Sequence, residues 1–253
     1  MKARVSEQGV LCKISQYSES SLILHVFGRQ RGMVSVLAKG IRKKQEQDLL
    51  AVLSEYEFNL YEPVAGGVYL LGDFSLSAEH DFSQSVQKWA AAQCAVELYS
   101  KLIIPTEEAP VYYKLLQTWL EYLPGVEGSV MLVWWRFLLR VFTLLGIPFS
   151  ATPCALCQQS PEHYAAYEKG SARLVCSACC ESLPDQDRLT ALSPLSARIL
   201  QLLPGIGSYL GRLKPDSIAT QQLNQLFEDY YQAHFNRDLK LRSLQVLAQL
   251  SAC

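Results

Sequence analysis

Four cysteines in two closely spaced pairs are the residues of this chain best suited to chemistry. Cys154 and Cys157 form one C-x-x-C pair, and after eighteen intervening residues Cys176 and Cys179 form another. This spacing is typical of a zinc site, because each short turn points two thiolates at one ion and the loop lets the turns close a tetrahedron. Four sulfur ligands leave no position for water, so the spacing predicts a structural zinc ion.

Two nearby side chains are alternative ligands: Cys180 can replace Cys179, and His163 lies between the pairs. Neither improves the C-x-x-C geometry, and core cysteines or a redox pair remain the other interpretation. The first pair also matches half of a nucleobase-deaminase signature, but the H-x-E half is missing from the sequence. Since the sequence also lacks the Walker A, H-E-x-x-H and G-x-S-x-G motifs, we expect the chain not to be an enzyme.

Short β-type runs occupy the first eighty residues and predict a small barrel. Apolar and polar residues alternate over 55–60, so that every second side chain would face water. The five predicted strands are 10–14, 22–27, 33–38, 56–61 and 68–76.

After residue 80 the pattern becomes helical. We expect Asp81 or Ser83 to cap the first helix, and a loop over 205–211 to end one of the later helices. The predicted helices are 81–104, 108–123, 129–146, 193–203, 217–235 and 239–250. The fold class is therefore α+β, with a barrel domain over 1–80 and a mainly helical domain over 81–253 that carries the cysteine module as an insert at 150–185.

Basic residues gather near the N-terminus, although over the whole chain 23 basic residues nearly cancel 24 acidic ones. Residues 1–44 hold nine basic and two acidic side chains, a net charge of +7. A small barrel with a basic stretch suits single-stranded nucleic acid, because cations follow the phosphates and aromatic rings stack on bases. Tyr17 is a candidate stacking residue, and a solvated surface with a plain loop tyrosine is the alternative. The candidate DNA-binding residues are Lys13, Arg29, Arg31, Lys39, Arg42, Lys43 and Lys44.

Several short motifs follow one another in a recognisable order. The motifs are Val10-Leu11-Cys12-Lys13, Tyr17-Ser18-Glu19-Ser20, Leu22-Ile23-Leu24, Ala38-Lys39-Gly40-Ile41-Arg42-Lys43, Leu144-Leu145-Gly146 before the cysteine module, and Leu239-Lys240-Leu241-Arg242 in the tail. Together they resemble the bacterial RecO family of DNA repair proteins over nearly the whole chain. Three positions depart from that pattern: Ser18 replaces a glycine, Gly28 a threonine and Leu241 a serine.

The resemblance implies an N-terminal OB-fold, a helical domain and a zinc module that some members lack. It also implies a non-enzymatic mediator that binds and anneals single- and double-stranded DNA, acts on DNA coated by single-strand-binding protein and cooperates with RecR to load the RecA recombinase. Two rival functions stay open: an RNA-binding factor, since both modules also serve RNA, and a protein-interaction scaffold.

Two arginines interrupt the most apolar helix. Arg136 and Arg140 are four residues apart and share one face. They are candidates for binding the acidic, apolar-ended C-terminal tail of single-strand-binding protein, the partner that the resemblance implies. The alternatives are pairing with Glu97 or Glu121 inside the chain, or reaching out to water at a helix edge.

The same two arginines argue against a membrane span over 130–146, so this stretch predicts a buried helix. The first twenty residues show no apolar stretch followed by a cleavage site. We therefore expect a cytoplasmic protein, associated with the nucleoid and not with a membrane.

Overall fold

The computed structural model describes residues 3–43, 46–63, 66–182 and 186–251. They group into two compact units, Met1–Gly125 and Val126–Cys253. The change from strands to helices falls between Ala78 and Val86, inside the first unit. Residue 80 thus marks a change in secondary structure, and its role as a domain boundary stays a prediction.

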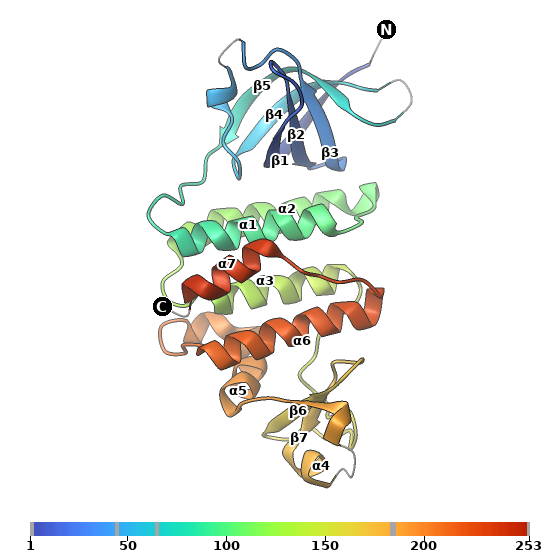
Figure 1. Cartoon of the computed structure of the whole chain (residues 1–253), viewed down its shortest axis with the longest axis vertical. Helices are drawn as coiled ribbons and strands as arrows, with labels where there is room; N and C mark the ends of the chain where they lie inside the picture. The colour runs from blue at the N-terminus through green and yellow to red at the C-terminus, as the bar shows by residue number, and fades with distance from the viewer. Residues whose placement is uncertain (1–2, 44–45, 64–65, 183–185, 252–253) are drawn as a thin grey trace. The chain divides into compact units, whose positions relative to one another are not determined.

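Five strands of the first unit close into a barrel (Figure 1). They are β1 (Arg4–Gln16), β2 (Leu22–Gly28), β3 (Gly32–Ala38), β4 (Glu55–Tyr61) and β5 (Tyr69–Ala78). The strand order is β1-β2-β3-β5-β4, and antiparallel pairing of β1 with β4 closes the ring. Among the described strand pairs, β3 with β5 is the parallel one. A small five-stranded barrel of this kind is an OB-fold, so the predicted barrel is confirmed.

Alternating side chains fill the barrel. Tyr56, Phe58 and Leu60 of β4 are fully buried in its core, as the alternation predicted. Glu55, which begins the same strand, was expected to face water and is only 1% exposed. That expectation is wrong because side chains from elsewhere in the first unit surround the carboxylate, as described below.

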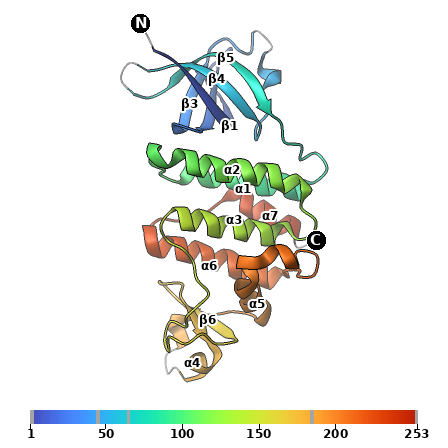
Figure 2. The ribbon, with the colours of Figure 1, turned by 180° about the vertical axis from the view of Figure 1, so that it is seen from behind.

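Two helices complete the first unit and lie side by side (Figures 1 and 2). They are α1 (Val86–Lys101) and α2 (Ala109–Tyr122). The predicted cap of α1 is wrong: the Ser85 hydroxyl, not Asp81 or Ser83, accepts the N–H of Lys88 at 3.3 Å. Asp81 instead accepts the N–H of Ser83 at 2.8 Å in the turn before the helix. Helix α1 packs on the barrel: the rings of Phe27 in β2 and Tyr99 in α1 meet edge to face, with centroids 4.9 Å apart.

The second unit combines a helical bundle with a small sheet. Its longer helices are α3 (Val130–Leu144), α5 (Pro194–Leu202), α6 (Ser217–Phe235) and α7 (Arg242–Ser251), and the module holds β6 (Tyr164–Glu168), β7 (Leu174–Cys176), the short α4 (Ser177–Ser182) and β8 (Leu189–Ala191). The sheet order is β7-β6-β8, so β8 pairs with the strands of the cysteine module, and the module's limits of 150–185 stay a prediction. After α5 the chain forms 3-10 turns over Leu203–Tyr209, where a loop was expected.

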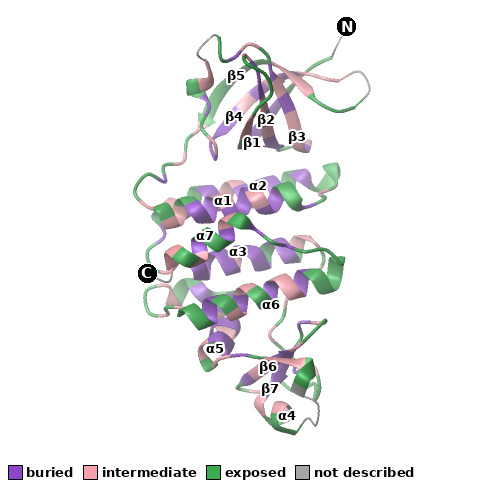
Figure 3. Ribbon diagram, in the orientation of Figure 1, coloured by how far each residue is buried: buried purple, intermediate pink, exposed green. Residues whose placement is uncertain are grey.

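Helix α3 is buried along most of its length, as predicted (Figure 3). Within the described ranges, none of the helices has the length and apolar character that a membrane span requires.

Candidate metal centre and nucleic-acid interface

The four predicted cysteines converge on one point. Cys154 and Cys157 lie in the turn before β6, Cys176 ends β7 and Cys179 lies in α4. All four sulfur atoms lie within 4.8 Å of one another, and the Cys157 and Cys176 sulfurs are 3.9 Å apart. A tetrahedron of sulfurs around zinc, with bonds near 2.3 Å, has edges of about 3.8 Å. The donor set and its spacing therefore fit a tetrahedral metal ion.

Backbone N–H groups also point at these sulfurs. The N–H of Cys176 donates to Cys154 Sγ at 3.3 Å, and the N–H of Cys179 donates to Cys176 Sγ at 3.4 Å. Burial raises the pKa of Cys154, but donors from Cys157, Cys176 and Leu156 outweigh burial and lower the pKa to about 6. Such donors favour the thiolate, the form that binds metal.

Thiolates packed this closely repel one another unless a cation lies between them. The hydrogen bond from Cys179 to Cys176 accordingly raises the pKa of Cys179 to about 12, because the proton is shared between the sulfurs. A bound divalent cation removes the need for that proton. The cluster is thus suited to metal in charge as well as in geometry.

The two alternative ligands lie outside the group. Among the described residues, neither Cys180 nor His163 joins the four sulfurs. The backbone carbonyl of His163 accepts the N–H of Ser177 at 3.3 Å, which ties the start of β6 to the start of α4.

One end of the barrel carries a basic loop. Lys39, Arg42 and Lys43 follow β3 and are exposed. The N–H of Arg42 donates to the carbonyl of Ser20 at 3.3 Å, so the loop is tied to the turn between β1 and β2. That turn begins with Tyr17, whose side chain is 65% exposed. Cationic side chains and a free aromatic ring are the combination that single-stranded nucleic acid binds.

The other predicted basic residues are placed differently. Lys13 is exposed on β1, whereas Arg29 and Arg31 lie at the far end of β3, in the turn after β2. Seven residues of β3 separate this turn from the basic loop, which is about 20 Å of extended chain. The candidate residues therefore occupy two ends of the barrel, and Lys44 lies outside the described residues. Their contact with DNA stays a prediction.

Arg31 already has partners within the chain. It forms a 2.5 Å ion pair with the fully buried Glu7 carboxylate and a 3.6 Å pair with Glu62. Because these contacts hold its guanidinium, Arg31 is a weaker candidate for phosphate binding than the exposed Arg42.

Comparison with known families agrees with this geometry. The model for the N-terminal part of recombination protein O matches residues 1–71, and the model for its C-terminal part matches residues 83–243. This chain belongs to the RecO family. A DNA repair protein RecO from Halalkalibacterium halodurans is 24% identical over 97% of this chain and 94% of its own length. One from Bacillus cereus is 22% identical over 96% of each chain. The family assignment gives the chain a role in DNA repair.

The arginine pair of this RecO chain lies on one edge of α3. Arg136 is partly buried and Arg140 is exposed. Burial and the charge of Arg140 both lower the pKa of Arg136, so the guanidinium would gain from a carboxylate beside it. Within the described part of the second unit, neither arginine has such a partner. Binding of a partner's tail here stays a prediction.

A buried polar network around Glu55 was missed by the sequence analysis. Tyr113 donates to Glu55 Oε2 at 2.7 Å, Gln117 donates to it at 3.3 Å, and His80 Nε2 lies 3.4 Å from Oε1. Burial raises the pKa of Glu55, but hydrogen bonds from His80 and Tyr113 outweigh it and bring the pKa below its ordinary value. The network links β4 to α2, and no sequence pattern indicates it, because its members are far apart along the chain.

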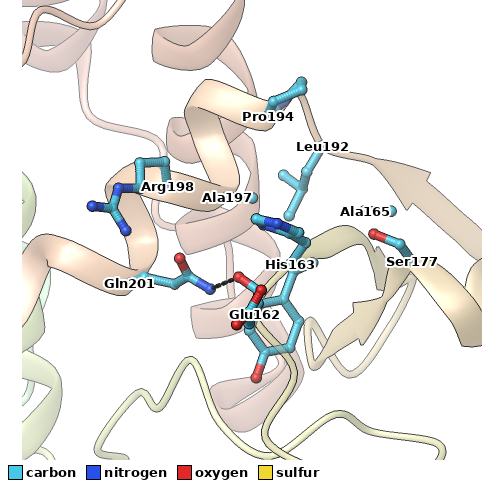
Figure 4. Close-up of a pocket in the computed structure, with 10 residues that line it drawn as sticks. Glu162, His163, Ala165, Ser177, Leu192, Pro194, Ala197, Arg198 and Gln201 are labelled. Atoms are coloured by element: carbon cyan, nitrogen blue, oxygen red, sulfur yellow. Dashed lines mark hydrogen bonds between the residues drawn. The ribbon is translucent and has the colours of Figure 1, made fainter.

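A cavity of about 540 Å³ lies between the cysteine module and α5 (Figure 4). Its walls come from β6, the first residue of α4, and the segment from Leu192 to Gln201. Nothing in the sequence predicts it, because β6 and α5 meet only in the folded unit.

Proposed function

We propose that this RecO chain is a non-enzymatic mediator of recombinational repair that binds and anneals DNA strands. The observation that carries the proposal is the exposed basic loop of Lys39, Arg42 and Lys43, hydrogen-bonded to the turn that presents Tyr17. Phosphates of a single strand can follow the loop while a base stacks on the tyrosine ring. Such contacts read no sequence, as an annealing protein requires.

Zinc is the metal we propose for the four-cysteine site, held by Cys154, Cys157, Cys176 and Cys179. Bound there, it would supply structural closure of the module, with all four coordination positions filled by sulfur. The surrounding residues would support the site in two ways. Backbone N–H groups stabilise negative charge on the sulfurs, and the pairing of β6 with β7 holds the two cysteine turns in place.

The partners we propose are single- and double-stranded DNA, RecR and single-strand-binding protein, with loading of RecA as the outcome. For the acidic tail of single-strand-binding protein, Arg136 and Arg140 support a docking site on α3, because neither has a carboxylate partner within the described part of the second unit. The cell compartment that fits these partners is the cytoplasm, at the nucleoid.

A strand-annealing assay tests the proposal directly. Two complementary single strands are mixed with the full chain, bare or coated with single-strand-binding protein, and the rate of duplex formation is measured. We expect acceleration in both cases. Matched DNA and RNA strands in a binding assay separate a DNA mediator from an RNA-binding factor, and equal affinity for the two, with no annealing, would contradict the proposal.

A further inference from the structure

The cavity between the cysteine module and α5 has walls that hydrogen bonds hold in place. Gln201 Nε2 donates to the carbonyl of Glu162 at 2.6 Å, and the N–H of Leu192 donates to the carbonyl of Ala165 at 2.7 Å. On the other side, the bond from Ser177 to the carbonyl of His163 fixes the start of α4. A cavity bounded this way exists before any ligand arrives, and its volume of about 540 Å³ is that of a small-molecule site.

The lining is apolar, and hydrogen-bond donors and an acceptor surround it. Ala165, Leu192 and Ala197 provide apolar surface. His163, Arg198 and Glu162 are exposed around it, and Figure 4 shows the imidazole between α5 and Ser177. Hydrogen-bond donors and an acceptor therefore surround a surface that favours a flat apolar group.

Tyr164 also lines the cavity, but its hydroxyl is buried and has no surface open to the cavity. Burial and the nearby Cys154 raise the pKa of this hydroxyl, so it lies toward the cysteine cluster. A ligand in the cavity would therefore meet the exposed polar groups of His163, Arg198 and Glu162.

We propose that the cavity receives an unpaired nucleobase of bound single-stranded DNA, an inference that rests on the proposed function. A base has apolar faces for the Leu192 and Ala197 surface, and an uncharged edge that both donates and accepts hydrogen bonds. The His163 imidazole and the Glu162 carboxylate can meet that edge, and Arg198 at the rim can meet the adjoining phosphate. A free phosphate fits less well, because the carboxylate of Glu162 would repel it.

The proposal predicts that blocking the cavity weakens binding through bases and not through phosphates. The probes are a fluorescent single-stranded 20-mer of mixed sequence and a strand of equal length made of abasic sites. We expect Ala197→Phe, which fills the cavity, and Arg198→Ala to bind the mixed strand at least about fivefold more weakly than wild type. With the abasic strand, Ala197→Phe should bind as wild type does.

Arg173→Ala is the matched control, because it removes an exposed arginine of the same module that is paired with Glu168 at 3.0 Å. It should leave both affinities unchanged.

A strand carrying 5-iododeoxyuridine, photo-crosslinked to the wild-type chain, provides a readout that needs no variant: we expect adducts on His163 or Tyr164. Wild-type affinity in both variants together with no adduct on His163 or Tyr164 would overturn the inference. Failure of the proposed function looks different, since the wild-type chain would then bind neither strand.

Discussion

The sulfur atoms of Cys157 and Cys176 lie 3.9 Å apart, although the two residues belong to different turns of the module. That distance is close to the edge of a zinc–sulfur tetrahedron, which is about 3.8 Å. The sheet strands that carry these turns are only three to five residues long. A metal ion is the strongest candidate for what holds these turns together.

We expect one zinc ion per chain in protein purified without chelators, and we expect Cys176→Ser to lose it. Because binding energy at structural zinc sites is folding energy, on the order of 10 kcal/mol, the variant should unfold the module. Elemental analysis and limited proteolysis between residues 150 and 191 measure the two effects. Cys180→Ser is the control, and it should keep both the metal and the protection. Full zinc content in Cys176→Ser would refute the four-cysteine assignment.

The Glu55 network predicts a pH-dependent contribution to stability. Tyr113→Phe removes a 2.7 Å hydrogen bond to a buried carboxylate, so it should lower the free energy of unfolding by about 1.5–3 kcal/mol. The pKa of Glu55 is lower in the folded chain than its ordinary value of 4.5, so the carboxylate stabilises the fold fully above that pH and loses this effect as the pH falls through the folded value.

Urea unfolding of wild type and Glu55→Gln at a series of pH values tests that sign. The difference in free energy of unfolding should be largest near neutral pH and shrink below about pH 4.5. Glu121→Gln, at an exposed position of α2, should match wild type throughout. A difference that grows as the pH falls would show that the network does not hold Glu55 as a carboxylate.

The arginine pair on α3 predicts a site for an acidic tail. A fluorescent peptide that ends in acidic residues, an apolar side chain and a free carboxylate should bind Arg140→Ala about tenfold more weakly than wild type, because a charge-assisted hydrogen bond is lost. Arg212→Ala, an exposed arginine of the same unit, is the control. Unchanged affinity in both Arg136→Ala and Arg140→Ala, with folding verified by circular dichroism, would leave these residues with a structural role only.

Local patterns were sufficient for much of this fold. The alternation that ends in Leu60 predicted a strand, because period-two burial is a property of the strand itself. Likewise, the two C-x-x-C turns predicted the metal cluster, since each turn sets the direction of its own sulfurs. Leu241, a departure from the family pattern, is 2% exposed and so has become part of the core.

Long-range placement explains what the sequence analysis missed. Arg29 and Lys39 belong to one basic stretch of the sequence, yet strand β3 separates them to opposite ends of the barrel. Glu55 lies at a polar position of its strand's alternation, but it is buried and accepts a hydrogen bond from Tyr113, 58 residues away. Gly28 replaces the threonine of the family pattern where a Cβ would lie 2.5 Å from the Glu7 carboxylate. Each of these depends on which segments meet after folding.

The basic loop predicts how binding of single-stranded DNA depends on salt. Each phosphate contact contributes about −0.7 to the slope of log affinity against log salt concentration. Replacing Lys39, Arg42 and Lys43 with alanine should therefore flatten the slope by about two units if all three contact phosphates. The control is a charge-matched triple variant in which three exposed lysines elsewhere, Lys101, Lys114 and Lys214, are replaced with alanine. It should keep the wild-type slope.

The slope of the loop variant is the most direct test of the central claim, that this end of the barrel binds DNA. The measurement is fluorescence anisotropy of a labelled single strand, titrated with the full chain at four or more salt concentrations. We predict a slope about two units flatter than wild type, together with weaker binding at low salt. A wild-type slope and affinity in the loop variant would contradict the claim and move the DNA-binding surface away from the barrel's basic loop.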